Sequence, residues 1–286
     1  MTKVSVIIPS RNEMFLQKTV ADLLVKATGD IEVIAVLDGY WPVPPLTEDK
    51  RLIQLHRGTA LGLRAGVNAA ASVARGEYLM KCDGHCMFGE GWDEILKADC
   101  EDNWVVVPRR FSLDAENWKP QKEPIDYEHI FFPHAHPDDL GLHARPWMER
   151  SRDRKDILID EDMSFQGYSW FMSMKHFKRL GGLSEEGYLT FMGEPQEIHF
   201  KTQLGSSEGK LMRNKKTWFA HLHKGKQYGR GYHMAQSERI NGNAYSFDFW
   251  WNNRWTERVH DIDWLFEKFW PIPSWPENWR EISGYA

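Results

Sequence analysis

The sequence predicts a doubly wound α/β sheet, and three observations lead to that prediction. Apolar, β-branched runs such as Val4 to Ile8 are typical of strands that are buried on both faces of a parallel sheet. These runs alternate with segments of helical period over the first hundred residues. Polar residues gather where the runs end, and such sheets bind ligands beyond the carboxyl ends of their strands.

The first two strands and the helix between them are clearly marked. Residues 9–13 break the first strand, and the helix that follows keeps its apolar side chains on one side until Gly29 closes it. Ile31 to Leu37 is the second strand, which stops at Asp38-Gly39. Arg51 to Leu55 is expected to form a third, shorter strand.

The next elements complete the alternation. Thr59 to Ala74 is rich in Ala and Gly and helical in period, so it should pack tightly against the sheet. Glu77 to Cys82 is the fourth strand, Trp92 to Ala98 a helix, and Trp104 to Pro108 a further strand. From 109 to 162 the pattern dissolves into Pro, His, Asp and aromatic residues, which indicates a long functional insertion or lid.

Regular structure is expected to return after the insertion. A strand-like run covers 164–174, a helix runs from Lys175 to Gly181, and another passes through Phe200 to Leu204. The end of the chain is rich in tryptophan, since seven of the 14 lie between Trp250 and Trp279. Aromatic residues at this density pack or bind, so we expect this tail to wrap the core.

Composition excludes several classes of protein. The net charge of −5 does not favour a general nucleic-acid binder. No run approaches the ~20 apolar residues of a membrane span, and the N-terminus is too short and strand-like for a signal peptide. Three cysteines without zinc-finger spacing predict free thiols in a reducing compartment, hence a cytoplasmic protein.

The segment Asp83-Gly84-His85 ends the fourth strand and is the first candidate for a site. In extended backbone, residues i and i+2 project from the same face, so both side chains can reach one point. A carboxylate oxygen beside an imidazole nitrogen suits Mn²⁺ or Mg²⁺, with a diphosphate filling the remaining positions.

Several segments in a fixed order resemble the GT-A fold glycosyltransferases of the broad family 2 class, most closely the polypeptide N-acetylgalactosaminyltransferases. The resemblance covers roughly residues 3–110 and 160–230. It departs from the family pattern at Phe191, Met192 and Pro195, and Lys224 stands where the family has Arg. The matching segments are Asp83-Gly84-His85, the preceding helix with Arg57 and 62–65, residues 191–197, and residues 220–224.

The resemblance implies a metal site and a diphosphate clamp. Asp83, His85 and His221 would hold Mn²⁺ (or Mg²⁺), although His221 could be a strand histidine satisfied by packing and His223 could be the ligand instead. The 210–230 stretch has seven Lys or Arg and no acid. The members that would clamp the diphosphate, unless they form a solvated basic face, are Lys224, Tyr228 and Arg230.

The resemblance also implies a uridine pocket at the ends of the first two strands. Asp38 could accept hydrogen bonds from the uracil or the ribose, the alternative being an ordinary turn. Arg57 and Arg64 could approach the nucleotide or lie on a helix surface. The remaining pocket residues would be Pro9, Arg11 and Glu13.

Two carboxylates and one indole complete the candidate set. Glu194 and Glu197 lie where inverting relatives carry a general base and retaining relatives bind the sugar, and acids at a helix N-terminus are the plainer alternative. Trp170 could stack on the donor sugar or lie in the core. The sequence does not choose between the two stereochemical outcomes.

The prediction is a glycosyltransferase that moves a sugar from a UDP-sugar to a hydroxyl of a protein or glycan. Residues 1–240 would form the GT-A catalytic domain, with a nucleotide-binding half to 110 and a sugar and acceptor half from 111. Residues 241–286 would form a Trp-rich extension packed on it. Two alternatives are a glycosyltransferase that acts on a hydroxymethylated base in DNA and a non-catalytic carbohydrate-binding module.

Overall fold

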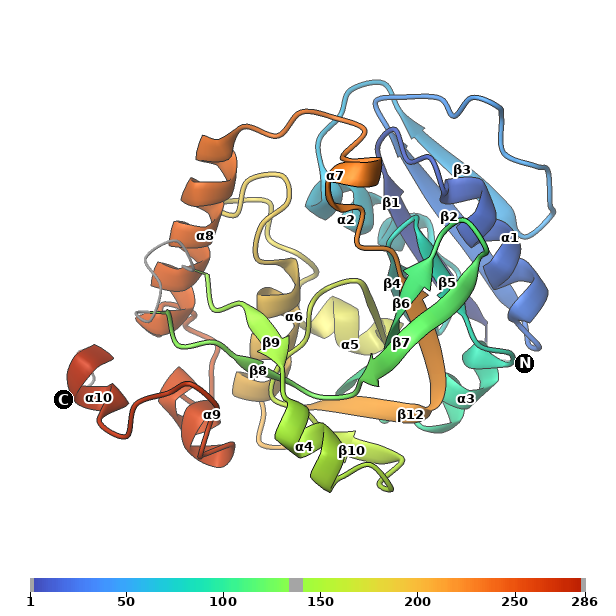
Figure 1. Ribbon diagram of the computed structural model, residues 1–286. Helices are drawn as coiled ribbons and strands as arrows, with labels where there is room; N and C mark the ends of the chain where they lie inside the picture. The colour runs from blue at the N-terminus through green and yellow to red at the C-terminus, as the bar shows by residue number, and fades with distance from the viewer. Residues whose placement is uncertain (1–2, 134–140, 284–286) are drawn as a thin grey trace.

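The computed structural model describes residues 3–133 and 141–283, and a large mixed sheet runs through its centre (Figure 1). The strand order is β10-β12-β6-β11-β4-β1-β2-β3, with β5 paired to β12 and β7 paired to β6. The strands are β1 (Val4–Ser10), β2 (Ile31–Asp38), β3 (Leu52–Arg57), β4 (Tyr78–Cys82), β5 (Cys86–Phe88), β6 (Trp104–Asp114), β7 (Lys119–Ile125), β10 (Ile159–Glu161), β11 (Ser169–Ser173) and β12 (Lys210–His221).

Strand β1 lies between two parallel partners, because Val4 is opposite both Ile31 of β2 and Tyr78 of β4. After β1, the chain adds β2 and β3 on one side of β1, and it then crosses to the other side to form β4. The right-handed crossovers α1 (Leu16–Lys26) and α2 (Leu63–Val73) therefore cover opposite faces. The predicted doubly wound α/β class is confirmed, and a crevice is expected where the strand order reverses.

The helices that follow β4 match the expected positions closely. Helix α3 spans Trp92–Ala98, α5 spans Met174–Arg179 and α6 spans Glu194–Leu204. Ser173 caps α5, because its hydroxyl oxygen accepts a 3.0 Å hydrogen bond from the His176 N–H. The bounds of α3 and α5 lie within two residues of those expected, whereas α6 begins at Glu194, earlier than the expected segment from Phe200 to Leu204.

The stretch from 109 to 162 is more regular than predicted. Strand β6 continues through Asp114 and turns back as β7, and a two-stranded sheet, a short helix and β10 follow. Parallel pairing with β12 holds β6 extended as far as Ser112, and such a distant partner leaves no local pattern. The additional elements are β8 (Glu128–Ile130), β9 (Ala144–Pro146) and α4 (Met148–Asp153).

The basic stretch that begins at Lys210 is mostly a buried strand, β12. Arg213 is 1% exposed, and its guanidinium lies 2.8 Å from Asp162 and 3.5 Å from Glu128. Charged side chains are buried in proteins only when they are paired, and here the two acids come from the segment before β11. The many lysines and arginines of this segment suggest an exposed surface, but the strand that they form is an inner strand of the sheet.

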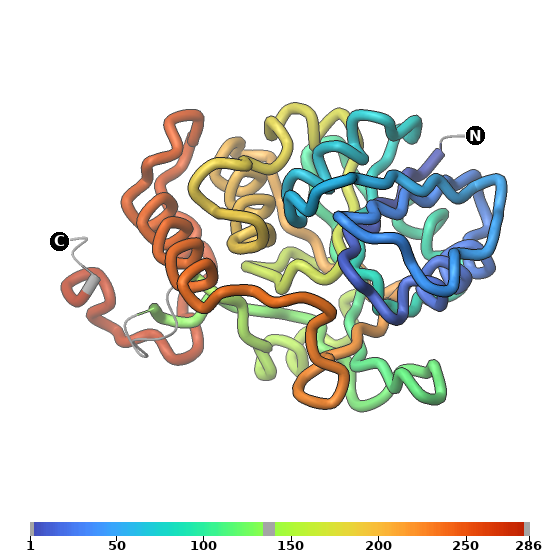
Figure 2. The backbone as a smooth tube through the Cα atoms, turned by 90° about the horizontal axis from the view of Figure 1, so that it is seen from above, coloured from blue at the N-terminus to red at the C-terminus, as the bar shows by residue number. Residues whose placement is uncertain are grey.

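The tryptophan-rich tail forms helices that build a second hydrophobic core. This core joins the tail to α6 and to the β8–β9 segment, with Phe200 and Ile130 as members (Figure 1). Figure 2 shows these helices on the side of the molecule away from the N-terminal strands. The tail helices are α8 (Gln236–Trp251), α9 (Ile262–Lys268) and α10 (Trp279–Ser283).

Two expectations from composition can be compared with the structure. Within 3–133 and 141–283, no helix is both long and apolar enough to cross a membrane. Cys82, Cys86 and Cys100 are free thiols, and the first two are buried. The pairing of β4 and β5 with their neighbours thus leaves both cysteines as packing residues.

We predict that Gly62→Ala destabilises the protein more than Gly181→Ala does. Gly62 precedes α2 with φ +91° and ψ 179°, and an added Cβ would lie 2.4 Å from the Cβ of Thr190. Gly181 has φ +74° but nothing within 4 Å of an added Cβ, so it controls for backbone strain alone. Strain costs about 1–3 kcal/mol at either position, and the clash adds to it only at Gly62. Equal losses of unfolding free energy in urea would contradict the close approach to Thr190.

We predict that Phe266→Ala lowers the free energy of unfolding by about 3–5 kcal/mol, because it opens a cavity in the second core. The ring is fully buried, with centroid distances of 4.6 Å to Trp275 and 5.5 Å to Trp279. Val259→Ala, at a side chain that is 63% exposed, should change stability by less than about 0.5 kcal/mol. Urea unfolding of both variants tests this, and similar values would mean that the tail contributes little.

Candidate functional site

A cavity of about 590 Å³ opens beyond the carboxyl ends of β1 and β4, where the strand order reverses. It is lined by the ends of these strands, by Asp38 at the end of β2, and by the loop that follows β12. Most of the residues predicted for the site meet here. The predicted residues in the lining are Pro9, Arg11, Glu13, Asp38, Asp83, His85, His221, Lys224 and Arg230.

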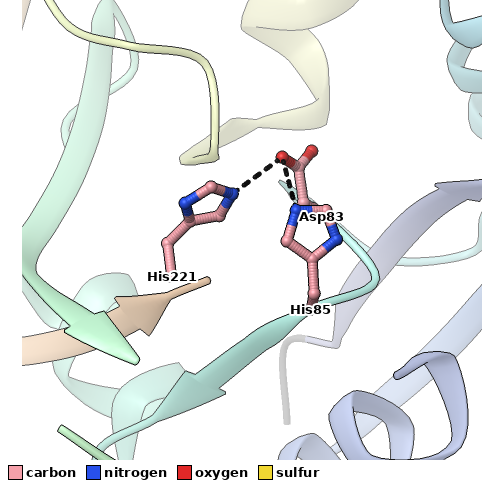
Figure 3. Close-up of side chains that lie close together, drawn as sticks. All are labelled: Asp83, His85 and His221. Carbon is pink, nitrogen blue, oxygen red and sulfur yellow. Dashed lines mark hydrogen bonds and ion pairs between the residues drawn. The ribbon is translucent and has the colours of Figure 1, made fainter. Parts of the chain in front are cut away.

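Asp83, His85 and His221 converge in this cavity (Figure 3). Asp83 Oδ2 lies 3.3 Å from Nε2 of His221 and 3.8 Å from Nε2 of His85. One potential ligand atom from each residue falls within 4.8 Å of the others. A carboxylate oxygen with two imidazole nitrogens is a donor set for a divalent transition-metal ion.

Strand geometry explains why these three residues meet. Asp83 directly follows β4, and Gly84 and His85 form a turn into β5 instead of the extended backbone expected from the sequence; His85 Nε2 lies 3.8 Å from Asp83 Oδ2. His221 ends β12 and is paired with Cys86, beside His85 in the chain. The Leu222 N–H also donates a 3.2 Å hydrogen bond to the His85 carbonyl, which fixes the two strand ends together.

The ring of His221 is held flat against Tyr168, with 3.7 Å between ring centroids and 14° between the planes. Burial lowers the pKa of His221 to about 3, although the Asp83 carboxylate opposes this shift. The ring is therefore neutral at physiological pH and can offer an unprotonated nitrogen. Its Nδ1 has no hydrogen-bond partner among the described residues.

Glu13 orients His85 from the end of β1. The Nδ1 atom of His85 lies 3.0 Å from Glu13 Oε2, which leaves Nε2 facing Asp83. Burial by itself raises the pKa of Glu13, but the bond to His85 and the ammonium of Lys224 outweigh it, so the pKa is lowered. Such outer partners are typical of metal-binding histidines, because they fix the ring and its tautomer.

Asp83 has a second partner that the sequence reasoning missed, namely Lys81. Its ammonium nitrogen lies 2.8 Å from Asp83 Oδ1 in the interior of the sheet. Burial raises the pKa of Asp83, yet the charge of Lys81 and the bond to His221 outweigh it and lower the pKa. The sequence does contain a sign of this contact. Lys81 is a charged residue in an otherwise apolar strand, two positions before Asp83, where alternate side chains point to the same face.

The predicted uridine pocket is only partly free to bind a base. The carboxylate of Asp38 accepts hydrogen bonds from the backbone N–H groups of Leu61 (3.0 Å) and Gly62 (2.8 Å). Arg57 does not line the cavity and lies 3.7 Å from Asp38. Arg11 lines it, with its guanidinium 4.7 Å above the ring of Tyr232. Tyr232 is a lining residue that no sequence motif indicated.

The loop after β12 brings the predicted cations to the cavity. Lys224 forms an ion pair with Glu13, and Arg230 lies 4.8 Å from the ring centroid of Phe191. Tyr228 does not line the cavity, because its ring packs edge-on against Phe15 at 5.4 Å. Tyr228 is the last residue of the short helix α7 (Gly225–Tyr228), and its ring points away from Lys224 and Arg230 toward Phe15.

Neither of the two predicted catalytic carboxylates reaches the cavity. Glu194 is 3% exposed, lies 3.3 Å from the Lys81 ammonium and accepts a hydrogen bond from the indole of Trp170. Glu197 is 1% exposed and pairs with Arg64 and Lys201. Burial raises the pKa of Glu194 in spite of Lys81. Both acids are held behind the cavity wall by the first turn of α6.

Arg64 and Trp170 are likewise interior residues. Arg64 donates to the carbonyls of Met192 (3.0 Å) and Ser184 (2.9 Å), so its guanidinium fastens the 183–193 loop to α2. Trp170 is fully buried in the main core and stacks on Phe177, which leaves no ring face for a donor sugar. Of the two possibilities given for Trp170, stacking on the donor sugar or lying in the core, the packing supports the core.

Comparison with known proteins bears on the family and the fold. No curated protein matches the sequence. A solved structure of GalNAc-T7 with UDP, GalNAc and Mn²⁺ is similar, with 16% identity and a TM-score of 0.68 over 99% of this chain. S. aureus TarS aligns over 78% of this chain and 37% of that one, with 13% identity and a TM-score of 0.49. The chain spans 55% of the GalNAc-T7 chain.

The first likeness confirms the predicted GT-A fold, and at this identity it shows the fold alone. The family is shown by the sequence itself, because residues 5–180 match the model of glycosyl transferase family 2. That match covers more than half of the 286 residues. The chain therefore belongs to glycosyl transferase family 2 and has the GT-A fold.

Proposed function

We propose that this protein is a metal-dependent glycosyltransferase that moves a sugar from a UDP-sugar to a hydroxyl acceptor. The observation that carries the proposal is the convergence of Asp83, His85 and His221 in the cavity beyond β1 and β4. Crystals of the similar GalNAc-T7 contain UDP and Mn²⁺, which supports this nucleotide and this ion for the present chain. A hydroxyl on a protein or a glycan is the acceptor that the family resemblance predicts.

The three side chains would hold Mn²⁺ or Mg²⁺. Asp83 and the two imidazoles offer oxygen and nitrogen donors within 4.8 Å of one another, and Glu13 fixes the ring of His85 from behind. Carboxylate and neutral imidazole nitrogen would repel each other without a proton or a cation between them, so the set fits such an ion. The ion would supply positive charge opposite the charge that develops on the leaving diphosphate.

The loop after β12 would contribute the protein's own cations to the diphosphate. Lys224 and Arg230 line the same cavity as Asp83. Gly225, the first residue of α7, and Gly229, directly after it, both adopt positive φ. Charge-assisted hydrogen bonds to phosphate oxygens would orient the leaving group. Lys224 forms an ion pair with Glu13, which also contacts His85, so its ammonium lies close to the proposed metal ligands.

Pro9, Arg11 and Asp38 would form the nucleoside end of the site. All three line the cavity at the carboxyl ends of β1 and β2, which is where doubly wound sheets bind nucleotides. We also propose that residues 1–240 are the catalytic domain and 241–286 an extension packed on it. The second core supports the packing, because it joins the tail to α6. The boundary after 240 falls within helix α8.

We predict that the wild type releases UDP slowly from one UDP-sugar with Mn²⁺ and without acceptor, and that EDTA abolishes the release. Asp83→Ala should lower this rate by at least about 100-fold, because it removes the only carboxylate of the ligand set. Release of UDP from a panel of UDP- and GDP-sugars is the measurement.

His56→Ala is the matched control for this prediction. His56 stacks on Trp41 outside the cavity, so its removal should leave the rate within about twofold of wild type. Undiminished turnover by Asp83→Ala, or in EDTA, would contradict the metal assignment. No turnover and no nucleotide binding by the wild type would favour a carbohydrate-binding module instead.

We predict that Arg230→Met raises the KM for the donor by about tenfold, as expected for the loss of one charge-assisted hydrogen bond to phosphate. The effect should shrink at high salt, because Arg230 is exposed. Arg239→Met removes an exposed arginine from α8 and should leave the KM unchanged. An unchanged KM in Arg230→Met would remove this residue from the clamp.

A further inference from the structure

Lys81 is a buried ammonium group with three acceptors and no route to water. It lies on β4 between β1 and β11, opposite Ile7 and Trp170, and its side chain is 1% exposed. Its nitrogen lies 2.8 Å from Asp83 Oδ1, 2.6 Å from the Gly167 carbonyl and 3.3 Å from Glu194 Oε2. An ammonium has three N–H donors, so all of them are used.

The acceptors come from three separate parts of the cavity wall. Asp83 ends β4, Gly167 precedes β11, and Glu194 begins α6. The wall is close-packed here, because a Cβ added to Gly167 would lie 2.5 Å from Glu194 Oε2. Lys81 thus fixes these segments relative to one another from inside the sheet.

The contact with Lys81 distinguishes the two oxygens of Asp83. Oδ1 accepts the bond from the ammonium, whereas Oδ2 faces His221 at 3.3 Å and His85 at 3.8 Å. The ammonium uses one acceptor site of Oδ1 and places a positive charge beside it, so an ion between the two imidazoles is directed to Oδ2. The two imidazoles add one nitrogen each, and the ligand set is small and rigid.

Building on the proposed function, we propose that Lys81 is a positioning residue that makes Asp83 a one-oxygen ligand and so selects small octahedral ions over Ca²⁺. Ca²⁺ binds 6–8 oxygens at longer distances and often takes both oxygens of a carboxylate, whereas Mg²⁺ and similar ions accept single oxygens. The ammonium at Oδ1 repels a second cation from that oxygen, which disfavours binding through both oxygens.

A purely structural role for Lys81 makes a different prediction. If Lys81 only neutralised the buried Glu194, its loss would destabilise the fold without changing which ion binds. Loss of its positive charge would strengthen the binding of every divalent ion to a similar degree. The ratio of the Ca²⁺ and Mn²⁺ dissociation constants therefore separates ligand geometry from charge.

The experiment is a Mn²⁺ titration of the full chain without donor, read from the EPR signal of free Mn²⁺, followed by competition with Ca²⁺. The variants are Lys81→Met and the double variant Lys81→Met with Glu194→Gln, which removes one buried charge of each sign and keeps the protein folded if the single variant unfolds. Asp83→Ala shows that the measured site is this one. Lys215→Met controls for loss of a buried lysine, since Lys215 donates to the Arg154 carbonyl far from the cavity.

The expected result is a ratio of Ca²⁺ to Mn²⁺ dissociation constants that falls by about tenfold in both Lys81 variants, the lower end of what outer partners contribute to metal affinity. Lys215→Met should leave the ratio unchanged. A wild-type ratio in Lys81→Met, or its return in the double variant, would overturn the role of Lys81 alone. No Mn²⁺ binding by the wild type would overturn the proposed metal site and this inference together.

Discussion

The site depends on the position of β1 between β2 and β4. Parallel hydrogen bonding in both directions aligns the carboxyl ends of these strands, so Glu13, Asp38 and Asp83 reach one edge of the sheet. Antiparallel pairing of β12 with β5 then adds His221 at the same edge. The three side chains proposed as metal ligands are thus positioned by the pairing of backbone strands.

Buried charge is the second organising feature, and two of its sets lie close to the cavity. Lys81 lies between two carboxylates beneath the cavity, and Arg213 lies between Asp162 and Glu128 beside it. Removing one partner of such a set costs about 3–5 kcal/mol, because an unpaired charge is left inside. Arg110 also pairs with Glu128 at 2.9 Å and lies 3.3 Å from His223, which joins the second set to the cavity.

The predictions from sequence succeeded where the signal was local. Strand parity brought out Asp83 and His85, and the alternation of apolar runs with helical segments gave the fold class and most of the first hundred residues. The length of β6 and the burial of β12 were not predictable, because both depend on pairing between strands about a hundred residues apart. A sequence motif specifies residue types but not whether a side chain faces the cavity or the interior. Four predicted site residues are for this reason buried outside the cavity lining: Glu194, Glu197, Arg64 and Trp170.

The distance in sequence between Asp83 and His221 has a consequence for how the protein folds. The two residues are separated by 138 positions, so the proposed ligand set cannot form until β12 has entered the sheet. Contacts of such high sequence separation form late and slowly, because the intervening chain must first lose its conformational freedom. Ion binding would then report that the last strand has docked, and would stabilise that final state by mass action.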